Sequence, residues 1–568
     1  MKNKQSYYLD GDFDSIVEKG AVKYKAVGQE RNNSAIVIEL SSTQKQTINH
    51  QAFSEIVNFY NTNEKSFKSF ENNLGIDVWF LQNLRLYYNY RDLLLDSALM
   101  GAFLDQVEDG IIITSNSLLL DFVDSSKIKV VPAKKVKKRK YKRFLAEIWL
   151  IVKQRSIRKQ RISKTVILSN ALDNPNGESK RFGSLEDSYD KIINRSLLET
   201  SNDLPKRANY SNQFINTDQL FKSYLKRFTF ISDYLKIKKA YKKLRRGILS
   251  TDNKLDTNQN VILNLFWNSR KSSYLYYLRY KSFSLFFRNH QIKAVLLSDE
   301  NGSQQKVVQY AAKKNKVKIA AFQHGAIARR FQLDYDFSKY NSKPLLPDVT
   351  FVWGEKYAEI LVDLGYPEGT INTCGRITPN KDSLPANSKF DEIENEIILY
   401  ATQPQPDQTL RVQQLKDVLL AAKEFRNQYS LVIRPHPGEK DDNYFLNIAK
   451  EVKCENFLID RVTALELQME KCELLITSYS TVGSEFIPFF KPLIVLDYLA
   501  EDMAGWIREG VGIPIANKNE LVEILKKEER PINNTMYEVF IKNYFYRIDG
   551  DAAIRAQEVI EKLIDKWE

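Results

Sequence analysis

The apolar residues of this chain fall into short runs that alternate with stretches of helical spacing. Three runs, "KAVLLSD", "VKIAAF" and "DVTFVWG", span 293–299, 317–322 and 348–354, and helical stretches cover 304–315 and 355–365. Short apolar runs separated by helices are typical of buried strands in a parallel sheet with helical crossovers. The pattern therefore predicts an α/β domain in this part of the chain.

Two earlier apolar runs, "KTVILSNA" (164–171) and "NVILNLFW" (260–267), are predicted to add strands to the same sheet. A polar, turn-rich stretch follows at 372–396 and is predicted to be a hinge between domains. The alternation then begins again with a helix at 410–425. The predicted strands of this second sheet are 396–402, 429–437, 457–460, 473–480 and 492–497.

The first 130 residues show the same mixture on a smaller scale and predict an α/β region of their own. Strands are expected at 34–40, 110–116 and 127–133, and helices between them. The predicted division of the chain is 1–160, 161–377, 378–545 and a last helix in 546–568. A chain of 568 residues is too long for one core, which agrees with such a division.

The net charge and the cysteine content indicate which class of partner the protein binds and in which cellular compartment it is found. The formal net charge is +13 and the pI about 9.1, which favours anionic partners. The three cysteines have no metal-ligand spacing and indicate free thiols in a reducing compartment. Neither a signal peptide nor a span of roughly 20 apolar residues is apparent. We expect a cytoplasmic protein.

Two basic segments that also contain aromatic residues, 133–164 and 222–247, stand out from the rest of the chain. They are compatible with solvated helices or linkers, and equally with helices lying on an anionic lipid surface. Single-stranded RNA is a third possibility, but no RNA-binding signature supports it. The expectation is peripheral attachment to the inner membrane, with no nucleic-acid partner.

Two of the four histidines follow predicted strands, one in each predicted sheet. His324 lies in "QHG" after 317–322, and His436 lies in "RPHP" after "YSLVI"; His50 and His290 have no comparable setting. In open α/β sheets, ligands bind beyond the carboxyl ends of the strands. The two histidines therefore indicate one cleft between two α/β domains.

On the second sheet, polar residues surround the start of the helix in "TSYSTVGSEF". Ser478, Ser480 and Thr481 can cap this helix and hold an anion, while Glu485 can accept hydrogen bonds from a ribose diol. The alternative is a capped helix without a ligand. The nearby strand ends add nucleotide-binding candidates, namely Arg434, His436 and Gln403.

On the first sheet, three residues are candidates for a general base. His324 can take part in acid–base chemistry, and Gly325 allows a close backbone approach. Asp299 and Glu300, in "SDENG", can deprotonate an acceptor hydroxyl or simply cap the next helix. DxD triplets occur at 10–14 and 334–336 without a preceding strand, so no metal and no cofactor are assigned.

The motifs "QHG", "FVWG", "ILYAT", "RPHP", "TSYSTVGSEFIPFFKPLIVLD" and "RIDGDAAIRAQ" occur in an order that resembles GT-B glycosyltransferases of bacterial surface-polysaccharide synthesis. The resemblance covers residues 290–565. It is closest to polysialyltransferase-like and Kdo-transferase-like enzymes and to CDP-glycerol glycerophosphotransferases. It implies two Rossmann-like domains, with acceptor binding by 161–377 and nucleotide binding by 378–545. It also implies that the final helix, in 546–568, packs back across the domains.

The resemblance also implies roles for single residues. His436-Pro437 matches the HP motif of bacterial sialyltransferases, and Ser478, Ser480 and Thr481 match their Ser/Thr element. The inserted Asn301 departs from their acidic base motif, whereas the glycerophosphotransferase pattern makes the histidine of "HG" catalytic and points to His324. The expected function is sugar transfer from a CMP- or UDP-linked donor to a surface polysaccharide or lipid-linked acceptor.

Two alternatives remain at this point. One is transfer of an alditol phosphate, glycerol or ribitol, from a CDP-linked donor on the same scaffold. The other is a nucleic-acid or membrane-binding protein with a vestigial cleft. The missing "GTRPE" signature argues against the related UDP-N-acetylglucosamine 2-epimerases.

Overall fold

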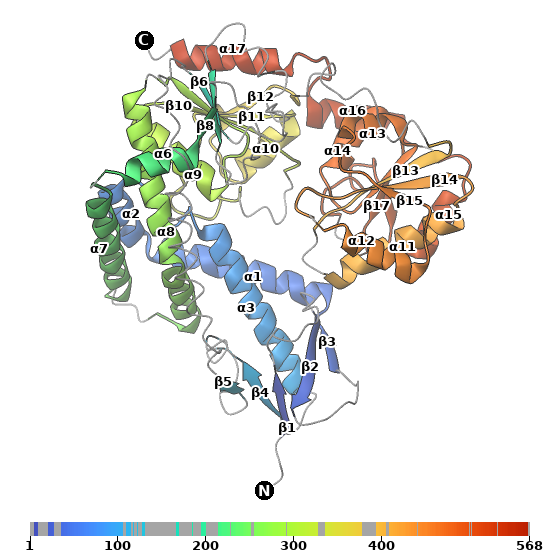
Figure 1. Ribbon diagram of the computed structural model, residues 1–568, viewed down its shortest axis with the longest axis horizontal. Coiled ribbons are helices and arrows are strands. Elements are labelled where there is room, and N and C mark those ends of the chain that lie inside the picture. The colour runs from blue at the N-terminus through green and yellow to red at the C-terminus, as the bar shows by residue number, and fades with distance from the viewer. Residues whose placement is uncertain are drawn as a thin grey trace.

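A computed structural model gives the arrangement of the chain (Figure 1). The described residues are 5–8, 21–27, 36–105, 110–114, 118, 122, 128–130, 166–169, 185, 195–199, 214–227, 229–250, 255–290, 292–327, 335–377, 393–404, 408–439, 441–498, 500, 502–530 and 532–565. The basic segment 133–164 and the hinge residues 378–392 lie outside them.

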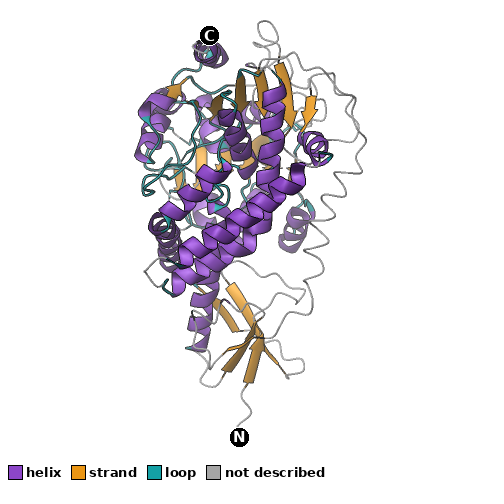
Figure 2. Cartoon of the chain, turned by 90° about the vertical axis from the view of Figure 1, so that its left-hand side faces the viewer, coloured by secondary structure: helices purple, strands orange, loops and turns teal. Residues whose placement is uncertain are grey.

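The N-terminal part contains a small sheet and three helices. The strands are β1 (Gln5–Tyr8), β2 (Ala21–Val27), β3 (Ile36–Glu39), β4 (Gly110–Thr114) and β5 (Ile128–Val130), in the order β3-β2-β1-β4-β5. The helices are α1 (Ser42–Thr62), α2 (Glu64–Leu74) and α3 (Asn83–Leu104). The sheet lies at one end of the molecule, beyond the long helices (Figure 2).

The N-terminal helices share a core with three later helices, α6 (Thr217–Leu225), α7 (Thr229–Leu249) and α8 (Thr257–Asn289). Trp79 is fully buried and packs on Phe59 and Phe266, with ring centroids 5.7 and 5.8 Å apart. Phe266 in turn stacks on Tyr241 of α7. The described N-terminal helices α1–α3 therefore pack against later helices of the chain.

The prediction of a strand at 260–267 is wrong, because these residues belong to α8. The helix begins with a capping box in which Asp256 accepts from the backbone of Gln259 and the Gln259 side chain accepts from the backbone of Asp256. Val261, Ile262 and Phe266 are all buried. A helix buried on several sides produces the same apolar run as a buried strand.

The first large sheet is built as the alternation predicts. Its strands are β6 (Val166–Ser169), β7 (Arg195–Glu199), β8 (Phe214–Asn216), β9 (Ala294–Leu297), β10 (Lys318–Phe322), β11 (Val349–Val352) and β12 (Ile371–Thr373). All pairs are parallel, in the order β12-β11-β10-β9-β6-β7-β8. The crossovers include α9 (Ser303–Lys314), α10 (Glu355–Asp363) and the 3₁₀ turn η3 (Glu368–Thr370).

The second sheet is also entirely parallel, in the order β15-β14-β13-β16-β17-β18. Its strands are β13 (Glu396–Ala401), β14 (Tyr429–Arg434), β15 (Phe457–Ile459), β16 (Leu474–Thr477), β17 (Leu493–Leu496) and β18 (Ile513–Ile515). Its helical segments are α11 (Gln408–Glu424), α12 (Asn443–Val452), α13 (Leu465–Lys471), α14 (Val482–Phe486), η6 (Ile487–Phe489) and α15 (Lys518–Leu525).

Both sheets have the strand order of the Rossmann fold, since the chain order reverses between β6 and β9 in one and between β13 and β16 in the other. The two domains lie side by side with the N-terminal helices beneath them (Figure 1). The predicted fold class, GT-B with an additional N-terminal α/β region, is confirmed.

The C-terminal segment returns to the first domain through α16 (Asn534–Phe545) and α17 (Ala552–Asp565). Buried residues of α17, including Ala556 and Ile560, share a core with β9, β10 and β11. Before that, the end of α16 packs on the end of β11, where Phe545 stacks on Trp353. Gly354 is extended and lies directly against the α16 backbone.

The second basic segment, 222–247, covers the end of α6 and most of α7, and most of its charges face outward, although Lys222 is buried. The inner side of α7 is buried through Ile237, Tyr241 and Leu244. The exposed basic residues of this helix are Lys236, Lys238, Lys239, Lys242, Lys243 and Arg246. Attachment of this face to an anionic membrane remains a prediction. Across the described residues, we find no helix both long and apolar enough to cross a membrane.

Candidate functional site

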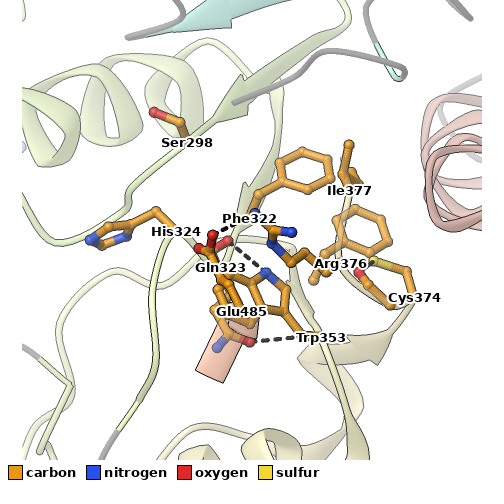
Figure 3. Close-up of a pocket in the computed structure, with 11 residues that line it drawn as sticks. Ser298, Phe322, Gln323, His324, Trp353, Cys374, Arg376, Ile377 and Glu485 are labelled. Carbon is orange, nitrogen blue, oxygen red and sulfur yellow. Dashed lines mark hydrogen bonds and ion pairs between the residues drawn. The ribbon is translucent and has the colours of Figure 1, made fainter. Parts of the chain in front are cut away.

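A pocket of about 160 Å³ lies where the carboxyl ends of β10, β11 and β12 meet α14 of the second domain (Figure 3). Phe322, Gln323 and His324 line it from β10, and Glu485 lines it from α14. Trp353 and the segment 374–377 complete the wall. The pocket therefore lies between the two domains, and of the two predicted histidines His324 lines it whereas His436 does not.

Gln323 fixes the shape of the "QHG" loop with both ends of its amide. The side-chain oxygen accepts from the backbone N–H of Trp353 at 2.9 Å, and Nε2 donates to the carbonyl of Gly325 at 2.7 Å. The indole Nε1 of Trp353 donates to the Gln323 carbonyl at 3.1 Å. These bonds fix Gln323 and Gly325, the residues before and after His324, so the backbone of His324 has a defined position.

His324 lines the pocket and is exposed, with its ring turned away from the Arg376–Glu485 pair in Figure 3. The next residue, Gly325, brings the loop up to the second domain. A Cβ placed on Gly325 would lie 3.1 Å from Oγ1 of Thr481. The predicted close approach at this glycine therefore brings two predicted site segments, "QHG" and the Ser/Thr element, into contact.

Arg376 crosses the boundary between the domains. Its Nη2 lies 2.7 Å from Oε2 of Glu485 and 3.7 Å from Oε1 of Glu466 in α13. The guanidinium also lies over the ring of Trp353, 5.8 Å from its centroid. Burial raises the pKa of Glu485, while the charge of Arg376 opposes this shift. Glu485, predicted to bind ribose, is thus paired with a cation here.

Asp299 and Glu300 do not line the pocket. Asp299 accepts from the backbone N–H of Asn301 at 2.8 Å and so stabilises the turn after β9. Glu300 is only 2% exposed and accepts a hydrogen bond from the hydroxyl of Tyr366 at 3.2 Å. Burial raises the pKa of Glu300 to about 8, and the charge of Asp299 adds to the shift.

The variant Glu300→Gln is expected to be more stable than the wild type at pH 8.5, by on the order of a few kcal/mol. The folded protein binds the Glu300 proton more tightly than the unfolded chain, so wild-type stability falls as the pH rises from about 4.5 to about 8. Gln mimics the protonated acid and removes this loss. Urea denaturation at pH 5 and 8.5 measures it.

The control for this prediction is Glu368→Gln, which changes an exposed carboxylate in η3. It should shift both denaturation curves equally or not at all. If Glu300→Gln and the wild type lose the same amount of stability between pH 5 and pH 8.5, Glu300 does not cause that loss.

At the second sheet, the ends of β13 and β14 are tied together around His436. Its backbone N–H donates to Oγ1 of Thr402 at 3.1 Å and to Glu439 at 3.0 Å. Its Nδ1 accepts from the N–H of Gly438 at 3.0 Å. Burial lowers the pKa of His436. The ring is therefore neutral at pH 7 with its proton on Nε2, which is a donor suited to a phosphate oxygen.

The other predicted nucleotide-binding residues lie at the same edge of the second sheet. Gln403 follows β13, and its buried Oε1 has no hydrogen-bond partner among the residues that the structure describes. Ser478 donates to Gln414 at 2.9 Å. Ser480 is buried, and its N–H donates to Thr477. None of these side chains lines the pocket described above.

Arg434 is partly engaged in structural contacts. Its Nη1 donates to the carbonyl of Thr463 and to Oε1 of Gln468, at 2.5 and 3.0 Å. These bonds fasten the segment between β15 and α13 to the end of β14. Burial lowers the pKa of Arg434. Contact between Arg434 and a donor phosphate remains a prediction.

The short helix α14 is held by Trp506. This indole is fully buried, and its Nε1 donates to the Ser484 hydroxyl at 2.9 Å. A Cβ on Gly483 would lie 2.3 Å from the Trp506 ring. The glycine of "STVGSE" is therefore required by close packing, and it keeps Glu485 at the pocket wall.

Sequence reasoning missed Arg376, Gln323 and Trp353. Each follows the end of a strand of the first sheet, which was the available signal. The segment containing Arg376 is polar and turn-rich and was interpreted as a hinge. Among the described residues, no group of three or more His, Cys, Asp or Glu side chains is arranged to hold a metal ion.

No protein-family model matches this sequence. No curated protein matches it at a significant level. Several solved structures have a similar backbone fold. The Staphylococcus aureus MnaA structure with UDP is 14% identical, with 71% of this chain and 97% of that chain covered and a TM-score of 0.44.

Two further structures are similar to the same degree. The UDP-GlcNAc 2-epimerase of Methanocaldococcus jannaschii is 14% identical over 70% of this chain and 99% of that one, with a TM-score of 0.42. The wall teichoic acid polymerase TagF is 15% identical over 77% of this chain and 99% of that one, with a TM-score of 0.44. Sequence identities this low do not show that this chain catalyses the same reaction as these proteins.

Proposed function

We propose that this chain is a glycosyltransferase that moves a sugar from a CMP- or UDP-linked donor to a surface polysaccharide or lipid-linked acceptor. The proposal depends on one observation, the meeting of "QHG" with the Ser/Thr element at Gly325 and Thr481. A residue suited to proton transfer thereby lies beside residues suited to hold a nucleotide. The order of the motifs along the chain supports the same function.

In the proposed reaction, His324 accepts the proton of the acceptor hydroxyl. The hydroxyl oxygen forms a bond to the anomeric carbon of the sugar, and the bond from that carbon to the donor phosphate oxygen breaks. The nucleotide leaves with the bonding electrons. Nε2–H of His436 and the hydroxyls of Ser480 and Thr481 would stabilise its phosphate, so the proposed mechanism requires no metal ion.

Calorimetric titration with CMP, CDP, UMP, UDP and GDP is expected to show selective binding of one nucleotide. In His436→Ala, its affinity should fall by about 10- to 100-fold, because one hydrogen bond to a charged phosphate is lost. His50→Ala, on the exposed face of α1, is the control and should bind normally. Absence of binding by every nucleotide would contradict the proposal and favour a binding protein with a vestigial cleft.

A second candidate is transfer of an alditol phosphate from a CDP-linked donor. It is favoured because, of the three candidate bases, only His324 lines the described pocket. The resemblance to glycerophosphotransferases assigns the catalytic role to this histidine. Sugar transfer from a CMP-linked donor also releases CMP, but only alditol phosphate transfer leaves phosphorus in the polymer. Mass analysis of the polymer therefore separates the two candidates.

A further inference from the structure

The pocket between the domains is occupied in part by the protein's own charges. At about 160 Å³ it is smaller than the roughly 300–1,000 Å³ of typical ligand pockets. Arg376 from the first domain and Glu485 from the second meet within it, 2.7 Å apart (Figure 3). A ligand of nucleotide size therefore has to part this ion pair.

Parting the pair without replacement would be costly. The side chains of Arg376 and Glu485 are only 18% and 12% exposed. Removing one partner of a buried ion pair leaves an uncompensated charge and is strongly unfavourable. Glu466, 3.7 Å from the guanidinium, offers Arg376 a second contact, but no other cation is among the residues that neighbour Glu485 in this wall.

A nucleotide carries a replacement for each partner. Its phosphate oxygens can accept the hydrogen bonds of a guanidinium, with the bidentate geometry that arginine favours. Its ribose diol can donate to a buried carboxylate. A ligand with only one of these groups makes hydrogen bonds to only one of the two side chains. The other side chain is then left as a buried charge without a partner, which is strongly unfavourable.

We propose that Arg376 and Glu485 form an exchangeable pair that the donor opens, with Arg376 passing to a phosphate oxygen and Glu485 to the ribose diol. This inference rests on the proposed function and adds Arg376 to the donor site. The site thereby selects ligands that carry a diol and an anionic group together. Because the two residues belong to different domains, donor binding also replaces a direct contact between the domains by one that passes through the ligand.

The pair predicts that one variant affects two ligands differently, measured by calorimetry on the full chain. Glu485→Gln releases Arg376 from Glu485, so inorganic pyrophosphate should bind about 5- to 10-fold more tightly than to the wild type. The preferred nucleotide should show no such gain, because the loss of its ribose contact offsets the release of Arg376. Arg376→Gln should weaken binding of both ligands.

The control is Asp442→Asn, which frees Arg461 from a more exposed ion pair of similar length, 2.6 Å, elsewhere in the second domain. It should change neither affinity. If the wild type binds nucleotide but Glu485→Gln binds pyrophosphate no more tightly, the exchange is overturned while the proposed function stands. If the wild type binds no nucleotide at all, the proposed function fails, and the exchange fails with it.

Discussion

Turnover by His324→Ala is expected to fall by about 10²- to 10⁴-fold, the usual contribution of a positioned general base. Nucleotide affinity should stay at the wild-type value, because none of the proposed phosphate and ribose contacts involves His324. His324 lines the pocket, and the Gln323 side chain fixes the loop around it. Steady-state rates, with calorimetry on the same preparations, measure both quantities.

Glu300→Gln is the comparison variant, because Glu300 is buried behind the pocket and should not transfer protons to the acceptor. We expect it to keep most of its turnover. A large loss of turnover in Glu300→Gln together with an active His324→Ala would reverse the assignment of the base. A loss of nucleotide affinity in His324→Ala would contradict the division of roles between the two domains.

Gly354→Ala is expected to destabilise the protein by about 1–3 kcal/mol or more, the range for overpacking in a well-packed core. A Cβ at this position would lie 2.4 Å from the carbonyl oxygen of Asn543 and 2.4 Å from the carbonyl carbon of Tyr544. Both are backbone atoms of α16, so no side chain can move aside. The contact between α16 and the end of β11 has to open.

Denaturant midpoints of Gly354→Ala and of Gly369→Ala provide the measurement and its control. An alanine methyl at Gly369 would meet no atom within 4 Å, so this variant should unfold like the wild type. Equal midpoints for the two variants would show that α16 does not pack on Gly354 as described. Nucleotide binding by folded Gly354→Ala would show whether the donor domain holds its ligand without the α16 contact.

The sequence pattern predicts the strands that carry the site because buried parallel strands are nearly continuous apolar runs. The runs that end before His324 and Arg434 are β10 and β14, and every residue from Ile319 to Phe322 is buried. The same rule fails at 260–267, where a helix is buried on several sides. The capping box of Asp256 and Gln259 was the local signal that distinguishes the two.

The site itself was predictable only in part. The carboxyl-end rule for parallel sheets places the segments at His324 and Thr481 at the ligand-binding edges of their sheets. The pairing of Arg376 with Glu485 does not follow from this rule, because it depends on how the two domains face each other. Nor does the sequence distinguish Asp299 from Glu300, since the course of one turn decides which carboxyl faces the interior.

The position of α17 has a consequence for the order in which the protein is made. The last strand of the first sheet, β12, ends at Thr373, yet one face of β9, β10 and β11 is covered by residues 552–565. Domains generally fold in the order of their synthesis. Here the first domain leaves the ribosome with an apolar sheet face uncovered, and the whole second domain is translated before that face is closed. A nascent chain of this protein therefore keeps this apolar face uncovered until residues 552–565 have been synthesised.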